Sequence, residues 1–284
     1  GEDRFWLGPE GGQFSIFFRP GDPFDLEHWF TPAPIDTLPY HLVWREHNRA
    51  VFQEDIELVN YSETHFKLRV RRAIVLLDES EIASHLDLAL PEDLQAVAFQ
   101  SENTITNLAD QPWTKQTGLL SIWILGMFKS SASTTVVIPF KTGPVSELGP
   151  IVNDAYFGKV PEDRLVIDTQ SGVIYFSGDG RHRSKIGLSP QRALDVLGSY
   201  DAASGTLTIV QYNKPPEARD YVNSMWEIQK EPFAGDVINS YNDGPPAPGA
   251  PQLGPFYELE TSSPAAALEP GQSLTHIHLS LIHI

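Results

Sequence analysis

Apolar and polar side chains alternate along much of the chain, and this pattern predicts β-strands. The clearest example is the pair of segments 51–60 (VFQEDIELVN) and 64–77 (THFKLRVRRAIVLL), which are joined by a short polar connection. Successive side chains of a strand point to opposite faces, so apolar residues at every second position indicate a half-buried strand. The short connection predicts that the two strands form an antiparallel hairpin.

The charged residues of this hairpin fall into two groups. Asp55 and Glu57 share a face of the first strand, and Lys67 and Arg69 share a face of the second, so we expect them to pair across the strands. Arg72 differs, because it continues the apolar series at every second position and points with it. An inward guanidinium needs either a carboxylate partner or a ligand, and both alternatives stay open for Arg72.

Most of the remaining chain also reads as β-structure. Residues 164–178 predict a second hairpin, and one short helix is predicted at 189–198, between Ser189 as a possible cap and Gly198 as a stop. Further strands are predicted at 13–19, 119–128, 134–140, 206–213 and 254–261. The expected architecture is all-β: one large antiparallel β-sandwich with little helix, formed as a single domain by residues 1–278.

Composition narrows the possible partners. The chain has 284 residues, of which 41% are hydrophobic, so it can bury a sizeable core. Lys and Arg number 20 against 37 Asp and Glu, a formal net charge of −17. This charge repels phosphate, which argues against nucleic acid and anionic membrane surfaces and favours a neutral ligand. The absence of cysteine excludes disulfides and thiol chemistry.

The C-terminal stretch SLTHIHLSLIHI contains His276, His278 and His283. Two histidines in a His-x-His pattern share a face of a strand, and a third nearby could complete a zinc site. However, residues 279–284 (LSLIHI) match the translation of a transposon-end adapter used in sequencing libraries. We interpret them as adapter-derived, and we therefore expect no metal site and no role for this segment in the fold.

The beginning of the sequence, GEDRFW, has no Met and no signal peptide. We expect the natural protein to be truncated at both ends in this sequence, and a periplasmic or secreted location is favoured over a cytoplasmic one.

Candidate chemistry lies in residues 254–261 (GPFYELET). In a strand, Glu258 and Glu260 would share one face. Two carboxylates that point together repel each other, which raises the pKa of one and suits acid–base catalysis. The alternative is a pair of solvated glutamates on an exposed face.

This region resembles the aldose 1-epimerases, or galactose mutarotases. That family carries a strand of the form F-x-L-E-T near its C-terminus, then a proline, then a strand opened by L-x-P-G-E that ends near a histidine. The matching residues here are Leu259-Glu260-Thr261, Pro264, Leu268-Glu269-Pro270-Gly271-Gln272 and His276. Upstream, GDVINSYNDG resembles the family's V-x-x-Y-x-x-N strand. The resemblance, to an uncharacterised bacterial branch, implies a galactose mutarotase-like sandwich with Glu260 as the catalytic base.

The resemblance also implies the ligand and its surroundings. It points to acid–base chemistry at the ring of a neutral sugar or glycan, without a cofactor. Aromatic side chains are the usual platform for a sugar face, and the candidates are Trp6, Trp29, Trp113, Trp123 and Trp226. Around Glu260 we expect Arg72, Trp123, Asn242, Asp243 and Glu258.

One element of the family pattern is missing. Mutarotases use a histidine acid in a motif of the form N-H-x-Y-F-N, whereas the nearest segment here, SENTITNLADQPW, keeps Asn103 and Asn107 without a histidine. Two classes of function therefore stay open. The first is a carbohydrate-active enzyme, and the second is a non-catalytic carbohydrate-binding module or a structural domain of a polysaccharide-processing protein.

Overall fold

The computed structural model describes residues 2–91, 94–247 and 249–283, and these residues form fifteen β-strands and three short α-helices. The strands of the first half of the chain are β1 (Glu2–Gly8), β2 (His41–Arg45), β3 (Arg49–Val59), β4 (His65–Leu77), β5 (Ala96–Asn107), β6 (Ser121–Lys129) and β7 (Thr134–Pro139). Those of the second half are β8 (Leu165–Asp168), β9 (Val173–Ser177), β10 (Ser184–Leu188), β11 (Val196–Asp201), β12 (Thr206–Tyr212), β13 (Ile238–Asn242), β14 (Phe256–Ser262) and β15 (Ser273–His283). The helices are α1 (Ala33–Asp36), α2 (Glu79–Leu86) and α3 (Val145–Leu148).

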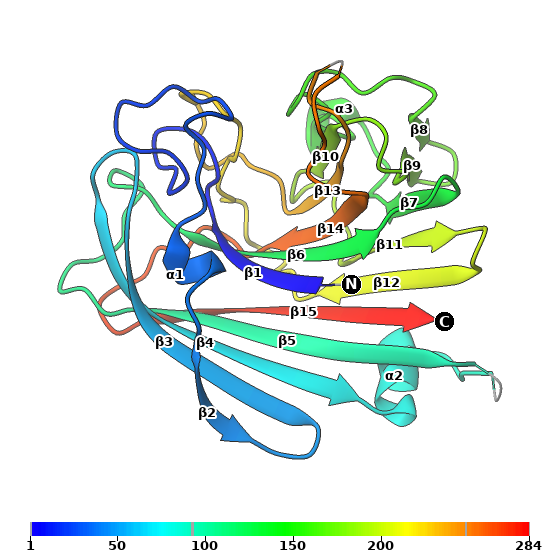
Figure 1. Cartoon of the computed structure of the whole chain (residues 1–284), viewed down its shortest axis with the longest axis horizontal. Coiled ribbons are helices and arrows are strands. Elements are labelled where there is room, and N and C mark those ends of the chain that lie inside the picture. The colour runs from blue at the N-terminus through cyan, green and yellow to red at the C-terminus, as the bar shows by residue number, and fades with distance from the viewer. Residues whose placement is uncertain (1, 92–93, 248, 284) are drawn as a thin grey trace.

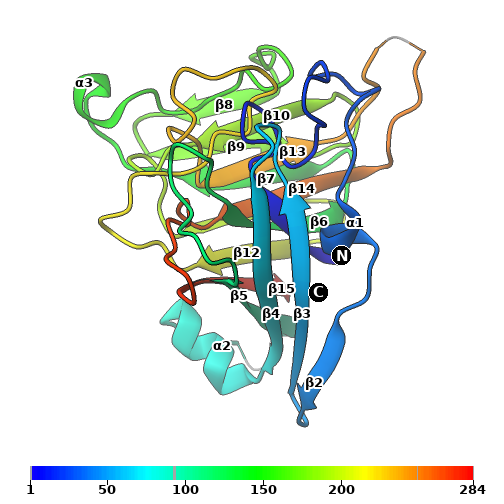
Figure 2. The same ribbon diagram turned by 90° about the vertical axis from the view of Figure 1, so that its left-hand side faces the viewer.

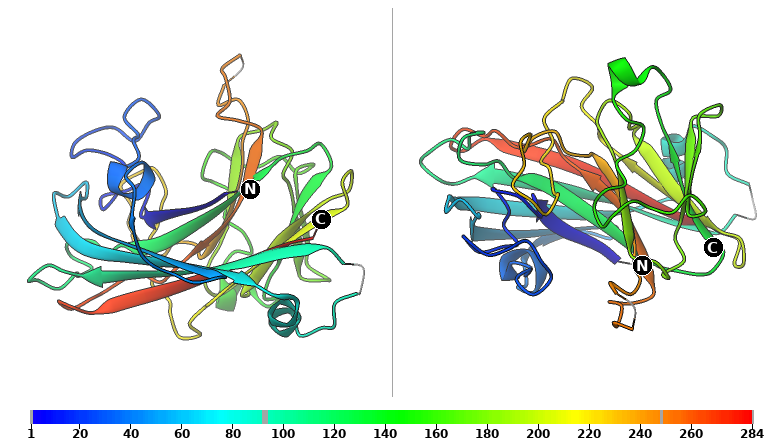
Figure 3. Two further views of the ribbon diagram at one scale, coloured as in Figure 1. Left: turned by 60° about the horizontal axis from the view of Figure 1, so that its bottom comes forward. Right: turned by 90° about the horizontal axis from the view of Figure 1, so that it is seen from above.

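The strands form two sheets that face each other (Figure 1). The smaller sheet has the order β1-β6-β14-β13-β10, and the larger has the order β2-β3-β4-β5-β15-β12-β11-β7-β9-β8. All of these pairings are antiparallel. Helix α2 lies on the face of the larger sheet that points away from the smaller one (Figures 2 and 3). The predicted antiparallel β-sandwich with little helix is confirmed.

The period-two pattern explains how the core forms. On β4, the alternating residues Phe66, Leu68 and Val70 are buried and point toward the smaller sheet, where Leu7 and Ile124 pack in the same core cluster. A second cluster fills the other end of the sandwich, around strands β7, β9, β10 and β12. Alternation places polar side chains on the outer faces, so both sheets bury one face at the shared interface.

Both predicted hairpins are present. Strands β3 and β4 pair along their length, and Arg69 Nε donates to Asp55 Oδ1 over 2.6 Å. Glu57 stands directly opposite Lys67 in the register. Strands β8 and β9 form the second hairpin. These charge pairs sit on the exposed face, where a single pair typically adds at most ~1 kcal/mol.

The strand predicted at residues 13–19 is wrong, because this segment forms turns and bends. Ile16, Phe17 and Phe18 are all fully buried, whereas a half-buried strand would send alternate side chains to solvent. The segment is irregular so that three consecutive apolar side chains can enter the core. Its backbone is held by Ser15, whose hydroxyl accepts a hydrogen bond from Phe17 N.

The helix predicted at residues 189–198 is also wrong. Residues 190–192 form a turn, and β11 begins at Val196. The turn places Arg192 at 0% exposure, where its guanidinium donates to the carbonyl oxygens of Lys141, Gly143 and Gly149. The long-range hydrogen bonds from Arg192 to loop carbonyl oxygens outweigh the local sequence features that favour a helix.

Residues 279–283 complete the long strand β15, between β5 and β12. Leu279 and Leu281 are 3% exposed and pack with Ile82 of α2. The side chains of Leu279 and Leu281 therefore form part of the packing in the structure.

Candidate functional site

Acidic side chains gather on the face of the smaller sheet that points away from the larger sheet. Glu258 and Glu260 lie two residues apart on β14 and therefore share this face. Trp123 comes from the neighbouring strand β6 and Lys185 from β10. Glu10, in the segment that follows β1, completes a group that we call the carboxylate cluster: Glu10, Glu258, Glu260 and Lys185.

Glu260 is the best-held member of the cluster. Its Oε2 accepts hydrogen bonds from Lys185 Nζ over 2.9 Å and from Trp123 Nε1 over 2.8 Å. The side chain is 0% exposed, and its Oε1 has no partner among the described residues. An unpartnered carboxylate oxygen beside a fixed ion pair is what a proton-accepting base needs.

Burial and mutual repulsion shift the ionisation of the cluster. Burial, followed by the nearby Glu260 charge, raises the pKa of Glu258 well above its ordinary value. Burial also raises the pKa of Glu10. Burial alone would lower the pKa of Lys185, but the Glu260 and Glu10 charges together outweigh it and raise that pKa. The arrangement therefore favours a charged lysine and a protonated Glu258.

Two chain segments cover this face, residues 9–31 and residues 221–233. They are joined by reciprocal hydrogen bonds, from Gln13 Nε2 to the Gln229 carbonyl and from Gln229 N to Gln13 Oε1, each 2.9 Å long. Gly12 has φ +82°, and a Cβ there would lie 2.5 Å from Gln229 Nε2, so only glycine allows this approach. We call these two segments the cover.

The cover supplies aromatic side chains to the cluster. Trp29 Nε1 donates to Glu10 Oε1 over 3.2 Å, and its ring lies 6.2 Å from that of Trp6. Trp6 in turn meets Trp123 edge to face at 5.5 Å. The ammonium of Lys185 lies 4.6 Å from the centre of the Trp123 ring, which adds a cation–π contact to the ion pair.

A polar network borders the cluster on the β10–β13 side. Asp236 Oδ2 accepts from Tyr156 OH over 2.7 Å and from Asn153 Nδ2 over 3.0 Å. Between this network and Lys185 lies a cavity of about 10 Å³, which is roughly the room that one water molecule needs.

Comparison with known proteins places the chain in a family. The model of the family of unknown function DUF6786 matches residues 1–284. The chain belongs to the DUF6786 family. No curated protein matches this DUF6786 sequence.

Solved structures share the fold of this DUF6786 chain. A proposed aldose 1-epimerase from Escherichia coli K12 is similar with a TM-score of 0.56 at 13% identity, over 98% of this chain and 83% of that one. A galactose mutarotase-like protein from Lactobacillus casei ATCC 334 gives 0.51 at 8% identity, over 99% and 85%. A protein from Synechocystis sp. PCC 6803 gives 0.51 at 11% identity, over 98% and 78%. The fold is therefore galactose mutarotase-like, as the LET motif implied.

The predicted site residues do not all meet. Trp123, Glu258 and Glu260 lie together. Arg72 lies on the other side of the smaller sheet, where its Nη2 donates to Asp3 Oδ2 over 2.8 Å. Asp3 faces Arg72, which also donates to the Asp3 carbonyl over 2.7 Å. Of the two alternatives for the inward Arg72, the structure contains the carboxylate partner, and 15% of the Arg72 side chain is exposed.

Asn242 and Asp243, at the end of β13, are fully buried and fully engaged with loops. Asn242 accepts from Gly180 N and donates to the His182 carbonyl. Asp243 accepts from Tyr241 OH over 2.7 Å and from Gly254 N over 2.8 Å. These contacts give both residues a role in shaping the loops beside the sheet.

His276 and His278 lie between the two sheets, where both contact Thr261 Oγ1 over 2.8 Å. Burial lowers the pKa of His276 to about 3. Among the described ranges, no group of three or more His, Cys, Asp or Glu side chains could hold a metal ion. Within the same ranges, no helix is long and apolar enough to cross a membrane.

Sequence reasoning missed two members of the carboxylate cluster, Glu10 and Lys185, and the nearby Tyr156. The sequence around Lys185 carried a usable signal. Ile186 and Leu188 are apolar and share one face of the strand, so Lys185 must lie on the opposite face, away from the core. Glu10 and Tyr156 lie in irregular segments, where no periodicity indicates which way a side chain points.

Proposed function

We propose that this protein binds a neutral sugar at the carboxylate cluster and catalyses acid–base chemistry at the sugar ring, as aldose 1-epimerases do. The observation that carries the proposal is the Glu260 carboxylate, which is held on one oxygen by Lys185 and Trp123 while its other oxygen has no partner among the described residues. The galactose mutarotase-like fold supports a carbohydrate ligand, although it is shared at low sequence identity.

In this proposal Glu260 is the base and Glu258 is the acid. Glu260 takes the proton from the anomeric hydroxyl, and a protonated Glu258 gives a proton to the ring oxygen. The C1–O5 bond breaks to give the open-chain aldehyde, and the C1–C2 bond rotates. When the ring closes on the other face, the Glu258 carboxylate takes the proton of the O5 hydroxyl and Glu260 returns its proton to the carbonyl oxygen, so both residues regain their starting states. Residues i and i+2 of a strand are roughly 7 Å apart, which leaves room for the edge of a pyranose ring between the two carboxyl groups.

Electrostatics supports this division of roles. The ammonium of Lys185 stabilises the ionised form of its partner Glu260, and the burial that raises the pKa of Glu258 keeps a proton on that carboxyl. Glu258 would thus replace the histidine that the sequence lacks. Trp123 and Trp29 offer apolar ring surface for the sugar once the cover opens.

The test is mutarotation of freshly dissolved α-D-galactose and α-D-glucose, followed by polarimetry with the full chain. We expect acceleration over the spontaneous rate, and we expect Glu260→Gln to reduce it by about 10²- to 10⁴-fold with little change in sugar affinity. Glu57→Gln, which removes an exposed carboxyl from β3, is the matched control and should keep wild-type activity. If the wild type neither accelerates mutarotation nor binds either sugar, the proposal is wrong.

A second candidate is sugar binding without turnover. The observation that favours it is the complete burial of Glu260 in an ion pair with Lys185, because such a pair also serves a purely structural role. In that case the wild type binds sugar but leaves mutarotation at the spontaneous rate. Glu260→Gln would then change the binding free energy by only about one hydrogen bond, ~0.5–1.5 kcal/mol.

A further inference from the structure

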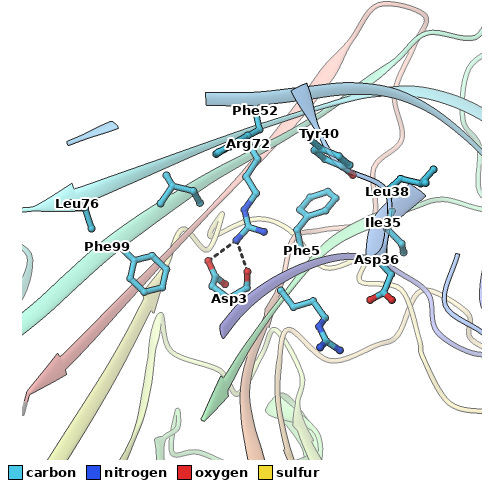
Figure 4. Close-up of a pocket in the computed structure, with 12 residues that line it drawn as sticks. Asp3, Phe5, Ile35, Asp36, Leu38, Tyr40, Phe52, Arg72, Leu76 and Phe99 are labelled. Atoms are coloured by element: carbon cyan, nitrogen blue, oxygen red, sulfur yellow. Dashed lines mark hydrogen bonds and ion pairs between the residues drawn. The ribbon is translucent and has the colours of Figure 1, made fainter. Parts of the chain in front are cut away.

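A second cavity lies between the edge strand β1, helix α1 and strands β3–β5 of the larger sheet (Figure 4). Its volume is about 820 Å³, which falls within the range of small-molecule sites. Asp3, Arg4 and Phe5 line it from β1, and Trp6 packs on the cluster side, against Trp123. The cavity is therefore separate from the site proposed for the sugar.

The walls of this cavity are mainly aromatic and aliphatic. They include Phe5, Tyr40, Phe52, Ile74, Leu76 and Phe99. The rings of Phe5 and Tyr40 meet edge to face at 6.4 Å. Such walls favour a ligand with an aromatic or other apolar body, because they offer dispersion contacts and little hydrogen bonding.

The polar lining of the cavity includes Arg4, Asp36 and the Arg72–Asp3 pair, and Figure 4 shows that pair between the aromatic walls. Arg72 Nη2 donates to Asp3 Oδ2 over 2.8 Å and to the Asp3 carbonyl over 2.7 Å. The Asp3 side chain is only 6% exposed. Three buried polar atoms have no partner among the described residues: Asp3 Oδ1, Arg72 Nε and Tyr40 Oη.

The hydrogen-bonding capacity of these three atoms indicates which chemical group of a ligand could pair with them. Asp3 Oδ1 accepts a hydrogen bond, Arg72 Nε donates one, and the Tyr40 hydroxyl can do either. The charged residues that line the cavity are Arg4 and Arg72 against Asp3 and Asp36, so their formal charges cancel and neither an anionic nor a cationic ligand gains a net attraction. A group that is neutral and both donates and accepts, such as a hydroxyl or a primary amide, matches the pattern.

We propose that this cavity is a second binding site, which takes a neutral small molecule with an aromatic or other apolar body and a hydroxyl or amide head at Arg72, Asp3 and Tyr40. Buried polar groups are normally hydrogen-bonded, so unsatisfied atoms on both partners of one ion pair indicate a missing partner. The site is independent of the sugar chemistry proposed above.

The first test uses 2-naphthol, naphthalene and 2-naphthoate as probes in fluorescence and calorimetric titrations of the full chain at neutral pH. We expect saturable binding of 2-naphthol, and at least about tenfold weaker binding of naphthalene, which lacks the hydroxyl, and of the anionic 2-naphthoate. Absence of saturable 2-naphthol binding overturns the proposal. Equal affinity for naphthalene overturns the assignment of a polar head group.

The second test locates the probe with two variants. Tyr40→Phe removes one unpartnered hydroxyl, so it should weaken 2-naphthol binding by about 2- to 10-fold and leave naphthalene unaffected. Tyr200→Phe, at an exposed tyrosine of β11, is the control.

Leu76→Trp adds bulk at the wall of the cavity and should abolish binding of both probes, whereas Leu207→Trp on the exposed side of β12 should not. Leu76 is itself 53% exposed, so the larger side chain does not have to enter the core and the variant should fold. Wild-type 2-naphthol affinity in Leu76→Trp, with the melting temperature preserved, shows that the probe binds elsewhere and refutes the site.

Discussion

At the scale of single residues, the carboxylate cluster is the most unusual feature of this chain. Three carboxyl groups, Glu10, Glu258 and Glu260, lie together in a buried setting, where Lys185 pairs with Glu260 and the Arg4 charge acts on Glu258. Ionising all three would leave uncompensated negative charge away from water, which is very costly. Proteins solve this by keeping a proton on one carboxyl, and Glu258 is the favoured candidate because burial and the Glu260 charge raise its pKa well above the ordinary value, whereas the pKa of Glu10 is raised without being placed well above it.

A Glu258→Gln variant tests this protonation state through stability. The pKa of Glu258 is raised in the folded chain, and the ordinary value is 4.5. Above pH 4.5 the unfolded chain loses a proton that the folded chain keeps, so the wild type loses stability as pH rises. Glutamine mimics the protonated carboxyl. The free energy of unfolding of the variant should therefore increase relative to that of the wild type by ~1.4 kcal/mol for each pH unit, until the folded-state pKa is reached.

The measurement is urea denaturation of both proteins between pH 4.5 and pH 8. Glu57→Gln, at the surface of β3, controls for the loss of one carboxyl. If the stability difference between Glu258→Gln and the wild type does not change with pH, Glu258 is ionised in the folded chain and cannot serve as the acid.

At the scale of elements, alternation predicted strands well wherever a strand buries one face. β3, β4, β8 and β9 were found in this way, with their hairpin connections. It failed at residues 13–19, where Ile16, Phe17 and Phe18 bury side chains on all sides. A run of apolar residues predicts that its side chains are buried, but it does not predict the backbone conformation that buries them.

The candidate site was predictable in part for the same reason. Glu258, Glu260 and Trp123 lie on regular strands, and their positions follow from period two once the strands are identified. Glu10 lies in an irregular segment that crosses the sheet after β1, so its meeting with Glu260 depends on tertiary packing. Arg72 was expected near Glu260. The pattern of its own strand shows that its side chain points inward, but it does not show which face of the opposite sheet the side chain contacts.

The end of β15 provides a prediction at the same scale. Leu281 is 3% exposed and packs with Ile82 of α2 and Ala98 of β5. Leu281→Ala should therefore lower the free energy of unfolding by ~2–3 kcal/mol, measured by denaturant titration. Leu207→Ala, at an exposed position of the adjacent strand, should cost less than ~1 kcal/mol. Equal stability of Leu281→Ala and the wild type would instead agree with a segment that has no role in the fold.

At the scale of the whole molecule, the two sheets and the cover act as three layers. The sandwich holds Glu258, Glu260 and Lys185 in a fixed arrangement, because their strands are paired on both sides or packed on the core. The cover is irregular, and it closes over Glu260 through contacts between residues more than 200 positions apart. Segments without regular pairing open more readily than sheets, so access to the cluster should be controlled by the cover.

Gln13→Ala tests the cover without reference to any ligand. The substitution removes both reciprocal hydrogen bonds between Gln13 and Gln229, each worth ~0.5–1.5 kcal/mol, so the open population should rise by roughly tenfold or more. We expect faster hydrogen exchange in peptides from residues 9–31 and 221–233, and unchanged exchange in β3 and β4. Gln53→Ala, on β3, is the control and should leave the cover protected. If exchange in the two cover segments stays at the wild-type rate, contacts other than the Gln13–Gln229 pair hold the cover closed.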